Sequence, residues 1–281
     1  MNNATVTRRK AFGLLGAISL AGTLAACGGS SASDQNQLEK IKSAGKIRIG
    51  MEGTFRPWGY HAGSGELVGM EKEIGDLIAK DLGVSAEYIE TQWDSLIAGV
   101  DADRYDIVIN NVGPTEERQQ KYDFSLTYVA SEGKVAVKKD SPLKKVSDIK
   151  GHTAASSETS NFRTLLEAEG ANIVTVTGFD EAIEQVLAGR VDCCGNDAVT
   201  FKAYDQEHPG ADYRLLEGTL GDASESAILM KKGQEALKAA IDDSLKKHME
   251  NGDFKAIYEK YVGIDLTPAQ YRLGTAATPT A

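Results

Sequence analysis

The chain has 281 residues, of which 41% are hydrophobic and 26% are charged. This composition is that of a globular protein with one or two hydrophobic cores, and it excludes an intrinsically disordered chain. The formal net charge at pH 7 is −10, and no stripe of basic residues offers a surface for nucleic acid, so we expect a small solute as the partner.

Residues 1–26 have the features of an export signal. A basic triplet, RRK at residues 8–10, precedes an apolar run shorter than the roughly 20 residues needed to span a bilayer. The run ends in LAAC, which resembles the lipobox of bacterial lipoproteins, in which the cysteine, here Cys27, carries a diacylglycerol and becomes the mature N-terminus. An ordinary cleaved signal with a chance cysteine is the alternative, and the arginine pair leaves a twin-arginine export route open. We therefore expect an exported protein, lipid-anchored to the outer face of the cell membrane, with residues 27–37 as a flexible Gly/Ser-rich tether.

After the tether, strands and helices alternate, which indicates an α/β fold with a parallel sheet. The clearest helix runs from Met70 to Leu82, where apolar residues recur at helical spacing and Gly83 supplies a C-cap. The other elements expected here are short: strands at 46–51, 84–90 and 105–111, a hairpin tip at 63–69, and a helix with Asp94 as its N-cap.

Two segments of the chain resemble each other. Residues 93–111 and 179–197 each open with an aromatic residue and an Asp, continue as an amphipathic helix, and end a strand on a polar pair. Chance similarity is the alternative, because helix-then-strand units look alike. Since open α/β sheets bind ligands at the carboxyl ends of their strands, the pattern predicts that Asn111 and Asp197 lie on opposite walls of one cleft.

From about Lys46 to about Val262 the chain resembles the family-3 extracellular solute-binding proteins, which are amino-acid receptors of ABC importers. The most specific part is TEERQQKYDFS at 115–125, preceded by ETQWDSLIAG at 90–99. The resemblance implies an α/β fold with two lobes, the type II periplasmic-binding-protein fold, in which each lobe is a mixed or parallel sheet flanked by helices and two hinge strands join the lobes. It divides the chain into lobe 1 at 38–132, lobe 2 at 133–225, a return to lobe 1 at 226–265 and a tail at 266–281.

The same resemblance implies a ligand site for a free amino acid. Arg118 corresponds to the arginine that binds the α-carboxylate, which its planar guanidinium suits. The remaining roles are Asp197 on the α-ammonium, the Gly113 carbonyl beside it, Asn111 in the same wall, Ser160 and Asn161 at a helix start facing the carboxylate, Phe55 and Trp93 around the side chain, and Glu52 at the mouth.

Each of these residues also has a purely structural interpretation. Arg118 could be a surface residue paired with Glu116 or Glu117, and Asp197 could cap a helix or pair within its lobe. Trp93 could pack against its own helix, and Phe55 could belong to the core.

Cofactor chemistry has little support in the sequence. The four histidines are scattered without metal spacing, so we expect neither a metal nor a cofactor. Cys193 and Cys194 are adjacent and cannot easily form an unstrained disulfide. A vicinal redox or metal pair is possible, but we interpret them as small core residues of a strand.

The function that follows is that of a monomeric substrate-binding lipoprotein that closes on an amino acid and delivers it to a membrane permease. The segments at 90–99 and 105–125 look most like those of cystine or cysteine receptors, so we predict L-cystine or L-cysteine as the ligand, with glutamine or arginine as alternatives. We expect no enzymatic activity. An exported dehydratase, with Glu52 as the one candidate general acid, and a sensory input domain are the rival classes.

Overall fold

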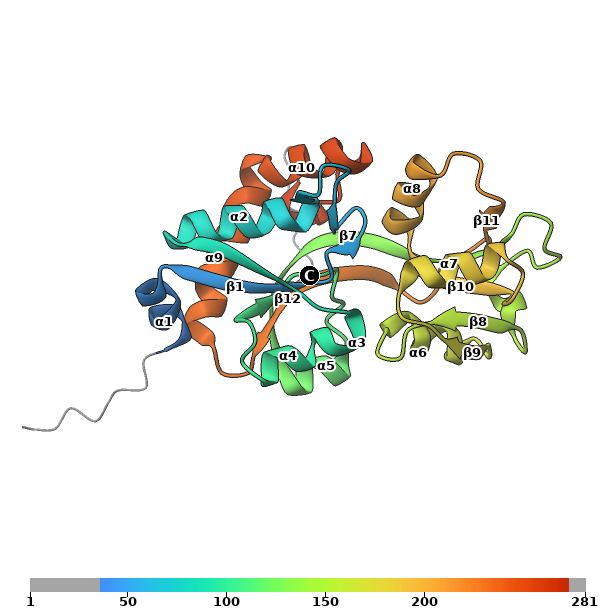
Figure 1. Cartoon of the computed structure of the whole chain (residues 1–281), viewed down its shortest axis with the longest axis horizontal. Helices are drawn as coiled ribbons and strands as arrows, with labels where there is room; N and C mark the ends of the chain where they lie inside the picture. Colours follow the sequence, from blue (N-terminus) through green and yellow to red (C-terminus); the bar gives the residue numbers. More distant parts are fainter. Residues whose placement is uncertain (1–35, 273–281) are drawn as a thin grey trace, which may run out of the picture. The chain divides into compact units, whose positions relative to one another are not determined.

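The structure is a computed structural model that describes residues 36–272 (Figure 1). The predicted signal peptide, the lipidation site at Cys27 and residues 27–35 of the predicted tether lie outside the described residues, as does the end of the predicted tail. No helix within residues 36–272 is long and apolar enough to cross a membrane.

A mixed sheet forms the centre of the molecule. Its strand order is β5-β1-β6-β12-β7-β10-β8-β9, with β11 paired to β7. The strands are β1 (Lys46–Met51), β5 (Ser85–Glu90), β6 (Ile107–Val108), β7 (Tyr122–Lys138), β8 (Thr153–Ser156), β9 (Asn172–Thr175), β10 (Cys193–Asp197), β11 (Tyr213–Leu215) and β12 (Ala223–Lys231). A second, three-stranded sheet contains β2 (Thr54–Phe55), β3 (Gly59–His61) and β4 (Leu67–Val68).

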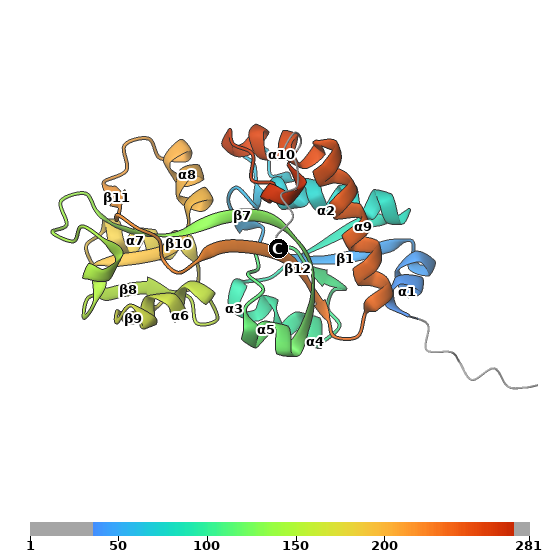
Figure 2. The same ribbon diagram turned by 180° about the vertical axis from the view of Figure 1, so that it is seen from behind.

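Helices flank the sheet in both halves of the molecule (Figures 1 and 2). They are α1 (Gln37–Ala44), α2 (Met70–Leu82), α3 (Trp93–Leu96), α4 (Ala98–Asp101), α5 (Glu116–Lys121), α6 (Asn161–Ala168), α7 (Phe179–Leu187), α8 (Ala198–Glu207), α9 (Glu235–Asn251) and α10 (Asp253–Val262), with short 3₁₀ turns η1 (Val146–Ile149) and η2 (Ala269–Tyr271).

The described chain has two lobes, as expected. The first lobe contains β5, β1 and β6 with α1 to α5, α9 and α10, and the second contains β10, β8, β9 and β11 with α6 to α8 (Figures 1 and 2). Parallel pairs β1–β5 and β1–β6 build the first lobe, and parallel pairs β8–β10 and β8–β9 build the second. Separate groups of buried side chains fill them, around Ile74 and Phe254 in the first lobe and around Leu166 and Phe201 in the second.

Two long strands connect the lobes. β7 and β12 pair in antiparallel fashion from Ala223 opposite Glu132 to Lys231 opposite Tyr122, and β7 continues into the second lobe, where it pairs with β10 and β11. The predicted lobe boundaries, 132/133 and 225/226, fall inside these strands; the boundaries themselves stay predictions. The connecting ribbon carries register shifts on both sides of Ala227.

Local sequence signals explain several elements. Met70, Ile74, Ile78 and Leu82 form the buried stripe of α2, and Gly83 ends the helix in the left-handed conformation with φ 74°. These bounds confirm the predicted helix, and strands β1 and β5 confirm two predicted strands. The hairpin β3–β4 pairs His61 with Leu67, which confirms the predicted turn between them.

Two details of the prediction were wrong. The helix expected to begin with Asp94 as N-cap is divided into α3 and α4, and its N-cap is Gln92. The side chain of Asp94 instead accepts hydrogen bonds from Thr159, which lies 65 residues further along the chain. The strand expected at 105–111 is reduced to Ile107–Val108, because β12 pairs with it only through Leu229 and Met230.

Candidate functional site

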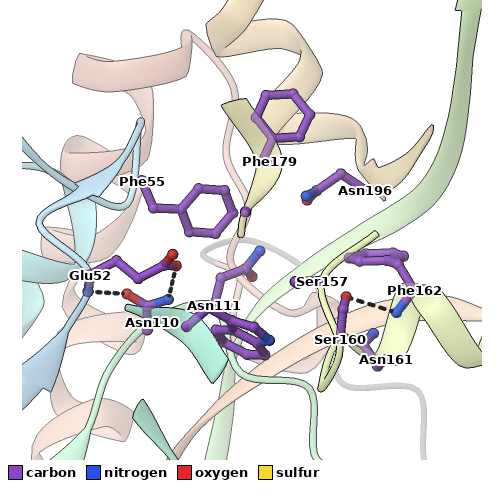
Figure 3. A pocket seen from close by; sticks show the side chains of 12 residues that line it. Glu52, Phe55, Asn110, Asn111, Ser157, Ser160, Asn161, Phe162, Phe179 and Asn196 are labelled. Atoms are coloured by element: carbon purple, nitrogen blue, oxygen red, sulfur yellow. Dashed lines mark hydrogen bonds between the residues drawn. The ribbon is translucent and has the colours of Figure 1, made fainter. Parts of the chain in front are cut away.

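A cavity lies where residues of both lobes meet (Figure 3). Glu52, Asn110 and Phe55 lie on one side, and the segment of Ser157 and Ser160 lies on the other. The complete lining consists of Glu52, Phe55, Trp93, Asn110 and Asn111 from the first lobe, and Ser157, Ser160, Asn161, Phe162, Gly178, Phe179 and Asn196 from the second.

Six of the nine predicted ligand-binding residues are among those lining residues, namely Glu52, Phe55, Trp93, Asn111, Ser160 and Asn161. Arg118, Gly113 and Asp197 do not line this cavity. They contact the segments that do, through the hydrogen bonds given below, so the structure brings all nine into one region.

The first-lobe wall of the cavity contains the carboxyl group of Glu52. Glu52 follows β1 and Asn110 follows β6, so both stand at the carboxyl ends of neighbouring parallel strands. The Asn110 amide donates to Glu52 Oε2 at 2.7 Å, and Asn110 Oδ1 accepts from the Glu52 backbone N–H at 2.8 Å. Burial raises the pKa of Glu52 to about 7, although the Asn110 hydrogen bond acts in the opposite direction. This carboxyl group can therefore change its protonation state near neutral pH.

The second-lobe wall carries hydrogen-bond donors. Ser160 is the N-cap of α6, and its Oγ accepts from the Phe162 N–H at 3.2 Å. Asn161 is the first residue of the helix, and Ser157 follows β8. The N-terminus of a helix favours a negative group, because its first N–H groups lack partners within the helix.

Arg118 is buried between the lobes, with 9% of its surface exposed. Its Nη1 donates to the Gly113 carbonyl and its Nη2 to the Thr159 carbonyl, each at 2.9 Å. The guanidinium carbon lies 5.4 Å from the centre of the Trp93 ring. Burial lowers the pKa of Arg118 to about 10.

Within residues 36–272, Arg118 forms no ion pair with any carboxylate. Glu116 and Glu117, the partners in its structural interpretation, do not pair with it either. Glu117 pairs with Lys121 instead. Burying a cation without a partner is costly. The Trp93 indole N–H, in the cavity wall, is likewise buried with no acceptor in the described chain. Within the described residues, neither this cation nor this donor is therefore paired with an anion.

Asp197 already has partners in this structure. It is the N-cap of α8, and its Oδ1 accepts from the N–H groups of Val199 and Thr200 at 2.8 and 3.0 Å. Its Oδ2 accepts from Thr200 Oγ1 at 2.9 Å and from Asn111 Nδ2 at 2.6 Å. Only 1% of the residue is exposed, and burial raises its pKa. Asp197 therefore caps a helix, as its structural interpretation holds. The prediction placed Asn111 and Asp197 on opposite walls of one cleft; they come from different lobes, but a direct hydrogen bond joins them and only Asn111 lines the cavity.

Asn111 is held in a left-handed conformation, with φ 50°. Its backbone N–H donates to Glu71 Oε1 at 2.6 Å, and its Oδ1 accepts from the hydroxyl of Ser226 in β12. Glu71 is fully buried and also accepts from the hydroxyl of Tyr128 in β7. Burial raises the pKa of Glu71 to about 8. Asn111 therefore links both connecting strands to Asp197 of the second lobe.

Sequence reasoning missed six lining residues, for some of which a signal existed. Asn110 and Asn196 belong to the polar pairs that end the two similar segments, and Phe179 is the aromatic residue that opens the second. The similarity has a structural counterpart, since Asp106 accepts from the N–H of Arg48 at 2.8 Å and Asp192 accepts from that of Thr153 at 2.7 Å. Ser157, Phe162 and Gly178 had no such signal.

The adjacent cysteines behave as core residues. Both lie in β10 and both are buried, and neither forms a disulfide within the part of the chain that the structure describes. Burial raises the pKa of Cys193 to about 12 and also raises that of Cys194. These thiols are therefore protonated at neutral pH, which confirms their interpretation as small buried residues of a strand.

Comparisons with known proteins find relatives over most of the chain. The chain is 34% identical over 253 residues to the L-cystine-binding protein TcyA of Bacillus subtilis, covering 87% of this chain and 94% of that protein. It is 33% identical to the L-cystine solute receptor of Neisseria gonorrhoeae, solved in the unliganded open conformation, with a TM-score of 0.59 and coverage of 82% of this chain and 98% of that one.

A solved ancestral arginine-binding protein bound to arginine is 29% identical, with a TM-score of 0.73 and coverage of 78% of this chain and 99% of that one. The similarity of shape is thus higher for the arginine-bound relative than for the open one, although the sequence identity is lower. The model of the family described as "Bacterial extracellular solute-binding proteins, family 3" matches residues 47–264. The chain is a member of this family of extracellular solute-binding proteins.

Proposed function

We propose that the protein is the substrate-binding component of an ABC importer, which binds a free amino acid between its lobes and delivers it to a membrane permease. The observation that carries this proposal is the buried guanidinium of Arg118, for which the described chain supplies no carboxylate. An α-carboxylate from a ligand satisfies that cation, and family membership supports an amino acid as its source.

The donors around Arg118 fit the carboxylate end of the ligand. The N-terminus of α6, with Ser160 and Asn161, faces the cavity from the second lobe. The indole N–H of Trp93 adds a donor for which the described chain supplies no acceptor. Charge-assisted hydrogen bonds of this kind are the strong ones in a site from which water is excluded.

The α-ammonium is assigned to Asp197, with the Gly113 carbonyl and Asn111 beside it. Because Oδ2 of Asp197 already accepts from Asn111 and Thr200, the ammonium has to replace or share the Asn111 hydrogen bond. We therefore expect the Asn111 side chain to move when the ligand binds.

The side-chain end of the site is assigned to Phe55, Phe179 and Glu52. A Cβ atom at Gly178 of the second lobe would lie only 3.8 Å from Glu52 Oε1, so the carboxyl group stands where the two lobes approach each other. A cationic end of the ligand next to Glu52 fits this arrangement. L-cystine has such an end in its second ammonium group, and two relatives at 33–34% identity are named for L-cystine. L-Cystine is our first choice, ahead of L-cysteine. The alternatives are arginine, whose side chain is cationic, and glutamine, whose side chain is uncharged.

Proton exchange on binding separates the ligands with a cationic side-chain end from those without one. A cation beside Glu52 favours its ionised form, so binding of L-cystine or L-arginine below about pH 7 should release a proton. Calorimetry at pH 6.5 in two buffers of different ionisation enthalpy measures that release. Protein refolded to remove carried-over ligand is titrated with L-cystine, L-cysteine, L-arginine and L-glutamine, with Glu52→Gln as the control that should release none. Tight binding of an uncharged side chain without proton release contradicts the assignment of a cationic ligand.

The remaining expectations are part of the same proposal. Lipid anchoring predicts that the parent fractionates with membranes and that Cys27→Ser is released. A monomer that closes on its ligand predicts a smaller radius of gyration in small-angle scattering with ligand than without. The rival dehydratase predicts turnover of prephenate or arogenate, followed by absorbance of the phenyl product, and such turnover would replace the transport proposal.

A further inference from the structure

Thr159, in the second lobe, directs all of its hydrogen-bonding groups at the first lobe. Its backbone N–H and its hydroxyl both donate to Oδ1 of Asp94, each at 2.9 Å. Its carbonyl accepts from Nη2 of Arg118, also at 2.9 Å. One residue of the second lobe is therefore held by two charged side chains of the first.

Within the described residues, the side chain of Asp94 forms no hydrogen bond in its own lobe. It stands in the first turn of α3 but does not cap that helix, which begins after Gln92 without a side-chain cap. Within residues 36–272, both hydrogen bonds of its side chain come from Thr159. An aspartate in a short helix turn is ordinary, but one whose hydrogen bonds cross to the other lobe can form them only when the lobes are closed.

Both partners are immediate neighbours of the cavity. Asp94 follows Trp93 in the first-lobe wall, and Thr159 precedes Ser160 and Asn161 in the second-lobe wall. Fixing Thr159 therefore fixes the N-terminus of α6 relative to Trp93 and Arg118. This N-terminus is the group that faces the ligand's carboxylate under the function proposed above.

We propose that Asp94 is a positioning residue that holds the second lobe closed over the bound amino acid, by binding the segment of Thr159 that also accepts a hydrogen bond from Arg118. The inference rests on the proposed function. It assigns to Asp94 and Thr159 control over how long the ligand stays bound, without direct contact with the ligand.

Two other contacts between the lobes involve a different helix of the second lobe. Trp58 Nε1 donates to Thr200 Oγ1 at 3.0 Å, and Arg56 pairs with Glu207 at 2.6 Å. Both involve α8 rather than α6. The Arg56–Glu207 pair is substantially exposed, and such surface pairs contribute little. The Arg56–Glu207 pair therefore serves as a control: it joins the lobes far from α6, whereas the Asp94–Thr159 contact joins them next to the N-terminus of α6.

The test is a double-mutant cycle on ligand release. Asp94→Ala, Thr159→Val and the double variant are loaded with radiolabelled L-cystine, or with whichever amino acid of the panel above binds the parent, and diluted into excess unlabelled ligand. Since both residues are exposed, we expect each single variant to release the ligand about fivefold faster, which is about 1 kcal/mol at 1.4 kcal/mol per decade. The association rate should stay within about twofold, because contacts made on closure act mainly on dissociation.

Further variants separate closure from general structural damage. The double variant should release no faster than the faster single one, because both changes remove the same interaction. Thr159→Ser keeps the hydroxyl and should behave as the parent. Glu116→Gln removes an exposed carboxylate of the same lobe, and Arg56→Gln removes the remote pair; both should leave release within about twofold. Unfolding midpoints without ligand should be similar for all variants.

The outcomes distinguish the two proposals. If no panel amino acid binds the parent, the proposed function is wrong. If the parent binds but Asp94→Ala releases ligand at the parental rate, the role of Asp94 is wrong while the function stands. Additive effects in the double variant, or an equal effect of Glu116→Gln, also overturn it.

Discussion

Replacing Arg118 by methionine should have little effect on the unliganded protein and a large effect on the complex. The pKa of the guanidinium is lowered by burial to about 10 from an ordinary 12.5. At 1.36 kcal/mol for each pKa unit, this corresponds to about 3 kcal/mol opposing the charged form in the folded protein. Against this stand the hydrogen bonds to the carbonyls of Gly113 and Thr159, each worth about 1.5–3 kcal/mol for a charged donor. The two contributions nearly cancel, so Arg118→Met should change the free energy of unfolding by only about 1–2 kcal/mol.

The ligand changes this balance, because its carboxylate compensates the buried cation. Removing one partner of such a desolvated pair costs roughly 2–5 kcal/mol, so the dissociation constant should rise about 30-fold or more. Calorimetric titration measures the affinity, and urea unfolding without ligand measures the stability. Arg214→Met is the matched control, since Arg214 also donates to a backbone carbonyl, that of Ser141, but lies away from the cavity. An Arg118→Met affinity within about threefold of the parent refutes the carboxylate assignment.

Three further predictions concern single residues. Trp93→Phe keeps the aromatic wall but removes the unpaired N–H, so calorimetry should show about tenfold weaker binding; an unchanged affinity means that the N–H does not reach the ligand. Burial raises the pKa of Glu71 from 4.5 to about 8. Between these two pH values the folded protein retains a proton that the unfolded chain has lost. The free energy of unfolding should therefore fall as the pH rises from about 4.5 to 8. Urea unfolding of Glu71→Gln should show a fall smaller by a few kcal/mol, and parallel curves contradict this. Gly69→Ala should destabilise the fold by about 3 kcal/mol in thermal unfolding, because φ is 135° and a Cβ atom would lie 2.2 Å from the Trp58 carbonyl oxygen; a loss below about 0.5 kcal/mol rejects that explanation.

The sequence predicts best those features that local interactions determine. The helix Met70–Leu82 is encoded by its own apolar spacing and by Gly83, and the structure confirms it. The burial of Glu71 within that helix could not be predicted, because its partners are Asn111 and Tyr128, which come from distant segments. A helical pattern shows that position 71 lies beside the buried stripe, but not that two donors meet it there.

The candidate site divides in the same way. Family motifs drew attention to Arg118 and Asp197, and the sequence left open whether Asp197 caps a helix. The prediction that Asp94 caps a helix was wrong, because its carboxylate accepts hydrogen bonds from Thr159 of the other lobe. Contacts between lobes leave no periodic signal in either segment, so only the folded arrangement reveals them.

The chain contains two tryptophans, and under the proposed function ligand binding should change the surroundings of both. Trp93 lines the cavity with an N–H that has no acceptor within residues 36–272, whereas Trp58 is buried and donates across the lobes to Thr200. If the proposed function holds, each indole is therefore an intrinsic fluorescent reporter of a different event: occupancy of the site for Trp93 and separation of the lobes for Trp58. A variant that keeps one of them should emit a fluorescence signal specific to that event, so that the time courses of ligand entry and of lobe movement can be followed separately without attaching a dye.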